Sequence, residues 1–249
     1  MSRWVFLRGW ARESRHWERF PEVFRRELPD AEVTAPDLPG NGTLHRERSA
    51  IAIAGMADHA RARMPVAQAH GPFHLLGLSM GGMACIAWAT RHPQEVAALV
   101  LVNTSVRPFS AAHRRLRPRI YPAILRVLLE RDERQRQALV ARLTTRDSAS
   151  DAALVERWAG WSRQYPLTRA NALRQLLAAA RFRAARDAPR CPVLVLASAR
   201  DALVDPDCSR RLATAWGARL AIHPDAGHDH TLDDPEWVAA QVRAWLRRS

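Results

Sequence analysis

Lysine is missing from this sequence. All 38 basic residues are arginine, and with 25 acidic residues they give the 249-residue chain a formal net charge of +13 at pH 7. A charge of this sign usually favours nucleic acid or an anionic membrane as a partner. The complete preference for arginine, together with abundant alanine, leucine and valine, instead indicates a GC-rich coding sequence and many solvated surface arginines. No nucleic-acid-binding motif accompanies the charge, so we expect no nucleic-acid partner.

Cysteine is scarce, and long apolar runs are absent. The three cysteines, Cys85, Cys191 and Cys208, are widely spaced and include no Cys-x-x-Cys pair. This pattern argues against a disulfide framework and against a zinc site. No run reaches the roughly 18 apolar residues that a membrane span needs, and "MSRWVFLRGW" lacks the extended apolar stretch of a secretion signal. We therefore expect a cytoplasmic, unexported protein that uses no metal and no cofactor.

Short apolar runs alternate with segments of helical length and helical periodicity. The expected strands are Trp4–Leu7, Glu32–Ala35, Phe73–Leu76, Ala97–Asn103, Val193–Ala197 and Arg219–Ile222. Strands separated by helices indicate an α/β fold with a mostly parallel sheet and helices on both faces. In such sheets a functional site forms beyond the carboxyl ends of the strands.

The alternation stops for some eighty residues in the middle of the chain. Within 107–186 the apolar residues recur at helical intervals, and no strand pattern stands out. We interpret this segment as a helical cap inserted into a core made of residues 1–106 and 187–249.

The stretch "FHLLGLSMGG" carries the strongest chemical signal. A buried strand pattern runs into Gly77-Leu78-Ser79-Met80-Gly81 and then into a helical pattern. Small residues on both sides of Ser79 allow a sharp strand-to-helix turn that exposes the hydroxyl above the sheet, at a helix N-terminus. Ser79 is therefore the candidate nucleophile, and the alternative is a serine that only caps the helix.

A serine nucleophile needs a general base and a carboxylate to orient that base. Asp201 follows the strand pattern of "CPVLVLASARDALVDP" and is the first choice for the carboxylate, with Asp205 and then Asp207 as alternatives. His228 lies on the loop after the last strand and is the first choice for the base. His230 is its alternative, and His223 is expected to be structural.

In the order Ser79, Asp201, His228 the chain resembles the α/β-hydrolase fold superfamily over nearly its whole length. The matching segments are "APDLPGNG", "GLSMGG", "ASARDALVDP" and "AGHD". Among relatives it is most similar to small capped serine esterases such as the pimeloyl-carrier-protein methyl ester esterase. The resemblance implies an oxyanion hole made by the backbone N–H groups of Trp10 and Met80. Ser198 departs from the pattern, since many relatives have glycine there, and Arg8-Gly9 stands where many have His-Gly.

Arg8 and several tryptophans are candidate substrate contacts. One hypothesis makes Arg8 structural, tying loop carbonyls or Glu13. The other lets Arg8 or Arg12 bind a substrate carboxylate or phosphate. Trp10 and Trp17 follow the first strand and are candidates for an acyl pocket, with plain packing as the alternative. The cap adds two candidate substrate contacts, Trp158 and Trp161.

These residues predict a serine hydrolase that cleaves a small-molecule carboxylic ester or other acyl substrate through an acyl-enzyme intermediate. Thioesterase, lactonase, amidase and perhydrolase activities use the same residues, so they stay open. A protein of this fold that binds a ligand without cleaving it is a further alternative. The segment 107–146 holds eleven arginines against three acidic residues, a net charge of +8, which fits either an acidic acyl carrier protein or ordinary surface charge.

Overall fold

The computed structural model describes residues 1–64, 72–146 and 151–248. Within them the chain forms a six-stranded parallel sheet with the strand order β2-β1-β3-β4-β5-β6. The strands are β1 (Ser2–Leu7), β2 (Ala31–Thr34), β3 (Phe73–Leu78), β4 (Val96–Val102), β5 (Val193–Ser198) and β6 (Arg219–His223). Each lies within two residues of a strand expected from the sequence, because continuous apolar runs are typical of strands buried on both faces. The expected mixed α/β architecture is confirmed.

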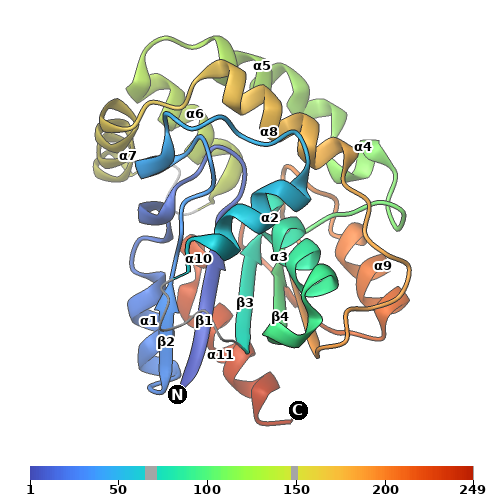
Figure 1. The fold of residues 1–249 in the computed structure, drawn as a ribbon. Coiled ribbons are helices and arrows are strands. Elements are labelled where there is room, and N and C mark those ends of the chain that lie inside the picture. The colour runs from blue at the N-terminus through green and yellow to red at the C-terminus, as the bar shows by residue number, and fades with distance from the viewer. Residues whose placement is uncertain (65–71, 147–150, 249) are drawn as a thin grey trace.

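Helices cover both faces of the sheet (Figure 1). The core helices are α1 (Phe20–Glu27), α2 (Ile53–Ala62), α3 (Met80–Arg91), α9 (Asp207–Trp216), α10 (His230–Asp233) and α11 (Pro235–Leu246). Short 3-10 helices are η1 (Ser14–Trp17), η2 (Gly42–Leu44), η4 (Pro93–Glu95) and η5 (Pro118–Ile120). Residues of α2, α3 and α9 share one apolar cluster with the sheet, and residues of α1 and α11 share the other. Alternate side chains of β1 enter different clusters, so its two faces are both buried.

Five helices lie between β4 and β5 in the described part of the chain. They are α4 (Ala112–Arg115), α5 (Tyr121–Leu129), α6 (Glu133–Thr144), α7 (Ala152–Gln164) and α8 (Arg169–Arg181), and we call them the cap helices. They lie above the end of the sheet at which β1 and β3 finish (Figure 1). An isolated parallel bridge between Arg107 and Arg183 joins the two ends of this segment. The cap helices therefore cover the sheet edge where parallel strands place functional loops.

Candidate functional site

Ser79 lies at the turn between β3 and α3, in a strained backbone conformation. Its φ is 55° and its ψ is −115°, and its N–H donates to Val102 O at 2.8 Å. A β-carbon on Gly77 would lie 2.5 Å from Gly82 Cα, and one on Gly81 would meet the Leu7 carbonyl oxygen. The two glycines are therefore required for this turn, as the sequence pattern predicted.

Asp201 lies just beyond β5 and is 2% exposed. Its Oδ1 accepts the N–H groups of Leu203 at 2.8 Å and Val204 at 3.0 Å. Its Oδ2 lies 2.7 Å from His228 Nδ1. An ionised carboxylate only accepts hydrogen bonds, so Nδ1 carries the proton and Nε2 of the neutral ring is an acceptor.

The His228 imidazole is buried, and its charge is governed by its neighbours. Burial lowers the pKa of His228, but the charge of Asp201 and its hydrogen bond outweigh burial, so the pKa is raised above 6.5. The nearby Asp229 raises this pKa further, and Arg8 lowers it. The protonated form of the ring is thus stabilised at this position, which is what a general base requires.

Ser79 and His228 line the same cavity, which we call the Ser79 pocket. Its rim near Ser79 is the β1 loop, Arg8 to Trp10, together with Arg12. Its remaining walls are mostly apolar side chains from β3, the loop after β5 and the cap helices: Leu78, Leu203, Ile124, Val127, Val140 and Leu143. A serine hydroxyl and an imidazole at the end of an apolar pocket suit a substrate with a hydrocarbon portion.

The loop after β1 passes directly against Ser79. A β-carbon on Gly9 would lie 3.3 Å from Ser79 Cβ. Two contacts to α8 hold the next residues: Trp10 Nε1 donates to Ala172 O at 2.9 Å, and Ala11 N–H donates to Gln175 Oε1 at 3.0 Å. Met80 is the first residue of α3, so its N–H belongs to the helix end that favours negative charge.

The alternative acids and bases have other partners. Asp205 accepts the N–H of Asp207 at 3.0 Å, and Asp207 pairs with Arg114 at 2.8 Å. His223 Nε2 lies 3.1 Å from Asp234 Oδ2 at the end of β6. His230 contacts Ser198 Oγ through Nδ1 at 2.9 Å, and burial lowers its pKa to about 3. Among the candidate acids and bases, Asp201 and His228 are the two whose side chains contact each other.

Arg8 forms a buried ion pair with Asp229, the residue next to His228. Nη2 lies 2.5 Å from Oδ2 and Nη1 lies 3.3 Å from Oδ1, and the guanidinium carbon lies 4.7 Å from the Trp17 ring centroid. Burial raises the pKa of Asp229, but the charge and hydrogen bond of Arg8 outweigh it and hold the pKa below its usual value. The tie to Glu13 that the sequence suggested is replaced by this pair, since Glu13 bonds to Arg15. The pair joins the β1 loop to the histidine loop.

The three tryptophans expected at the substrate lie elsewhere. Trp17 packs in the core 5.2 Å from Phe6, between ring centroids, and is 1% exposed. Trp158 is fully buried and donates to Glu18 Oε1 at 2.8 Å. Trp161 lines a small cavity beside His16 and does not line the Ser79 pocket. Trp10 is the only tryptophan among the described residues that line the Ser79 pocket.

Asn103 is a site residue that the sequence analysis missed. It follows β4 with a φ of 45°, a conformation that asparagine tolerates well. Its Nδ2 donates to His228 O at 2.7 Å and to Ser198 Oγ at 3.1 Å, and its Oδ1 accepts the Ser198 N–H at 2.9 Å. Ser198 in turn holds His230, so one buried amide joins the acid loop to the histidine loop. A polar residue directly after an apolar strand was the available signal.

The sequence predicted neither a metal site nor a membrane span, and the structure bears on both. Within residues 1–64, 72–146 and 151–248, no three His, Cys, Asp or Glu side chains are grouped so that they could hold a metal ion. In the same residues, no helix combines the length and the apolar character that crossing a membrane requires.

The sequence of the chain matches a known protein family and several named proteins. Residues 4–241 match the Alpha/beta hydrolase family. The pimeloyl-[acyl-carrier protein] methyl ester esterase of Aromatoleum aromaticum is 28% identical over 98% of this chain and 97% of that protein. The putative carbamate hydrolase RutD of Caulobacter sp. is 34% identical over 70% of this chain and 65% of that protein.

Solved structures share the fold. A thermophilic esterase from Thermogutta terrifontis matches with a TM-score of 0.76 and 24% identity, covering 100% of this chain and 90% of that chain. A meta-cleavage product hydrolase from Pseudomonas fluorescens IP01 matches with a TM-score of 0.81 and 17% identity, covering 100% and 91%. From the family match and the shared fold we conclude that the chain belongs to the alpha/beta hydrolase family.

Proposed function

We propose that this ester-cleaving hydrolase works through a covalent acyl-enzyme on Ser79, with His228 as general base and Asp201 as the residue that orients it. The observation that carries the proposal is the 2.7 Å contact between His228 Nδ1 and Asp201 Oδ2 at a pocket that Ser79 also lines. A neutral imidazole fixed in this tautomer presents Nε2 as the acceptor that a serine hydroxyl needs.

The reaction then has two stages, acylation of Ser79 and hydrolysis of the acyl-enzyme. Ser79 Oγ attacks the ester carbonyl carbon while its proton moves to His228 Nε2, which gives a tetrahedral oxyanion. The bond from carbon to the leaving alkoxy oxygen breaks, and that oxygen takes the proton from His228. Water repeats the steps on the acyl-enzyme and releases the acid. Asp201 stays ionised and stabilises the imidazolium in both halves.

We assign the oxyanion hole to the backbone N–H groups of Met80 and Trp10. Met80 begins α3, and the Gly9 backbone approaches Ser79 closely enough to bring the next N–H to the reacting carbonyl. Removing one such donor typically costs about 2.7–4 kcal/mol of transition-state stabilisation. The hydrogen bonds from the β1 loop to α8 support this role, because they fix a loop whose position the chemistry depends on.

Substitution of the two proposed catalytic groups tests the function. We expect Ser79→Ala and His228→Gln to lower kcat on p-nitrophenyl butyrate by a factor on the order of 10⁴–10⁶. His113→Gln is the matched control, because His113 is exposed and does not line the Ser79 pocket, and it should retain kcat. Full activity of Ser79→Ala would refute the mechanism.

Active-site labelling separates the enzyme from a ligand-binding protein of the same fold. A fluorophosphonate should form an adduct on Ser79 that intact-mass and peptide spectrometry detect, and Ser79→Ala should form none. Folded wild-type protein without an adduct, and without activity on esters, thioesters, lactones and peracid formation, would favour a binding protein.

We further propose an acidic acyl carrier protein as a partner at the cap helices. Three exposed arginines, Arg126, Arg134 and Arg142, line an open groove on α5 and α6. The relative from Aromatoleum aromaticum, which matches over nearly its whole length, is named for a carrier-protein substrate. If the groove binds the carrier, raising the salt concentration should lower kcat/KM on an acyl-carrier ester more than on a small ester. Equal salt dependence would exclude docking.

A further inference from the structure

A second cavity adjoins the Ser79 pocket beneath the cap helices. The two share the lining residues Trp10, Arg12, Val127 and Val140, so these side chains border both pockets. We call the second cavity the arginine pocket, because Arg12, Arg136 and Arg169 line it and no Asp or Glu is among its described lining residues.

Arg12 is a buried cation with an unused donor. Its side chain is 7% exposed, its guanidinium carbon lies 3.9 Å from the Trp158 ring centroid, and Nη1 donates to Gln137 Oε1 at 2.9 Å. Within the described residues Nη2 is buried without a hydrogen-bond partner. Burial, and then the charge of Arg8, lower the pKa of Arg12. Burying a donor without a partner costs free energy, and an anion that accepts a hydrogen bond from it removes that cost.

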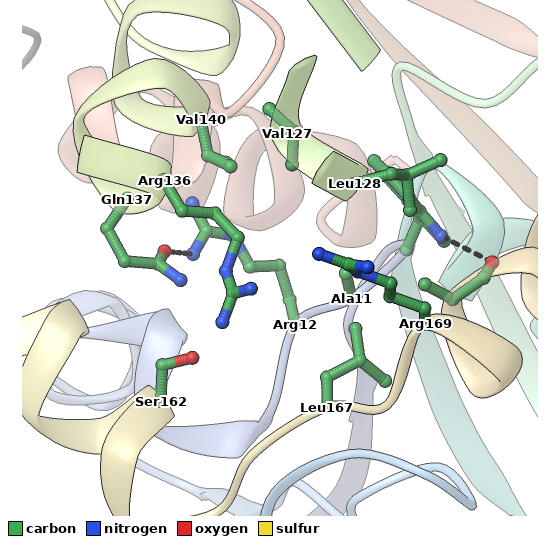
Figure 2. A pocket seen from close by; sticks show the side chains of 12 residues that line it. Ala11, Arg12, Val127, Leu128, Arg136, Gln137, Val140, Ser162, Leu167 and Arg169 are labelled. Atoms are coloured by element: carbon green, nitrogen blue, oxygen red, sulfur yellow. Dashed lines mark hydrogen bonds between the residues drawn. The ribbon is translucent and has the colours of Figure 1, made fainter. Parts of the chain in front are cut away.

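Arg136 and Arg169 bring two more guanidinium groups to the same cavity. Figure 2 shows them reaching into the pocket from opposite sides, Arg136 from α6 and Arg169 from the start of α8. Each has a contact outside the cavity: Arg136 pairs with Glu133, and Arg169 Nη2 donates to Leu129 O at 3.1 Å. Burial, and then the charge of Arg169, lower the pKa of Arg136. The two groups thus repel each other across a space that an anion can fill.

We propose that the arginine pocket binds a carboxylate carried by the ester substrate, at the far end of an aliphatic chain from the bond that is cleaved. The planar fork of Arg12 Nη2, with Arg136 and Arg169, supplies the charge-assisted hydrogen bonds that a carboxylate accepts. Val127 and Val140, shared by both pockets, provide an apolar wall for the connecting methylene groups. This inference rests on the proposed hydrolysis at Ser79 and names its substrate class.

Paired esters test the proposal in two series. On the acyl side, mono-p-nitrophenyl adipate and suberate are compared with p-nitrophenyl hexanoate and octanoate. On the alcohol side, 6-acetoxyhexanoate is compared with hexyl acetate. In at least one series, wild-type kcat/KM should be about 10- to 100-fold higher for the anionic ester, the factor that a hydrogen bond to a charged group supplies.

Arginine variants then locate the preference. Arg12→Met and Arg169→Gln should each lower the ratio of kcat/KM on the anionic ester to kcat/KM on the neutral ester towards 1. Arg169 is exposed, so that variant keeps the proposal testable if Arg12→Met fails to fold. Arg181→Gln is the matched control: it is exposed at the end of α8, lines neither pocket and loses the same charge, so the preference should survive.

Each result has one reading. Equal kcat/KM for anionic and neutral esters in both series overturns the carboxylate site while leaving hydrolysis intact. A preference that persists in both Arg12→Met and Arg169→Gln also overturns it. Wild-type protein inactive on every ester of both series refutes the proposed function itself, and so distinguishes the two failures.

Discussion

Replacing Arg8 by methionine should destabilise the fold and lower catalysis together. Arg8 and Asp229 are each 3% exposed at the side chain, and their closest atoms are 2.5 Å apart. Arg8→Met removes the cation and leaves the Asp229 carboxylate buried. Thr231 Oγ1 still donates to that carboxylate at 2.7 Å, but a hydroxyl does not neutralise its charge.

The expected magnitude follows from the burial of both partners. Breaking a buried ion pair by removing one partner costs about 3–5 kcal/mol. For a chain of about 250 residues, each kcal/mol lowers Tm by about 2–4 °C, so we expect Tm to fall by about 6–20 °C. Methionine preserves much of the apolar contact with Trp17, which favours the lower half of this range.

Catalysis should fall because the ion pair joins two loops of the site. Arg8 precedes Gly9 and Trp10, whereas Asp229 follows His228, so the pair fixes the proposed oxyanion donor relative to the base. Loss of one donor lowers kcat by about 10²–10³-fold, which bounds the effect of Arg8→Met. Because Arg8 is already paired with Asp229, anionic and neutral esters should lose activity equally.

A double-mutant cycle measures the pair. Thermal unfolding by circular dichroism and kcat on a neutral ester are recorded for wild type, Arg8→Met, Asp229→Asn and the double variant. We expect the double variant to be at least as stable as Arg8→Met, because neither Arg8 nor Asp229 then leaves its partner buried and charged. Additive losses in Tm, or a Tm of Arg8→Met within about 2 °C of wild type, would refute the reasoning.

Three further predictions concern pH and the loops around the base. Since the pKa of His228 is raised above 6.5 and its neutral form is the base, kcat/KM should rise with pH through an apparent pKa above 6.5. In Asp201→Asn that midpoint should move down, because burial is no longer offset; an unchanged midpoint would contradict the assignment. Asn103→Ala removes four buried hydrogen bonds and should cost about 1–3 kcal/mol in urea unfolding while lowering kcat, so unchanged values would show that the amide does not hold the loops. The lowered pKa of Asp229 means that its pairing with Arg8 stabilises the fold above about pH 4 and that this stability is lost as the pH falls through the folded-state pKa. Acid unfolding of Asp229→Asn should lack that component.

Local pattern was sufficient for the strands and for the turn at Ser79. A buried parallel strand is a short apolar run, and a serine flanked by glycines can occupy a strained strand-to-helix turn, so both are visible in a few adjacent residues. The sheet architecture and the family follow from these segments and their order along the chain.

The partners of Arg8 and Asn103 could not be predicted, because they are distant in the chain. Arg8 meets Asp229 and Asn103 meets Ser198 only when the sheet brings loops of different strands together. Helical periodicity likewise shows that Trp158 faces inward, but it does not show whether the interior there is a cavity or packed core. The structure places the Trp158 ring beneath Arg12, where it supports a charge.

The bridge between Arg107 and Arg183 has a consequence for how such proteins diversify. Ala184 N–H also donates to Arg107 O at 2.7 Å, so the chain leaves and rejoins the sheet-bearing part at neighbouring points. A segment whose ends meet adds little strain to the structure that carries it, whatever its length. Insertions, deletions and wholesale replacement between these two points can therefore be inherited without disturbing the strands. Evolution can exchange what covers the site while keeping the chemistry beneath it.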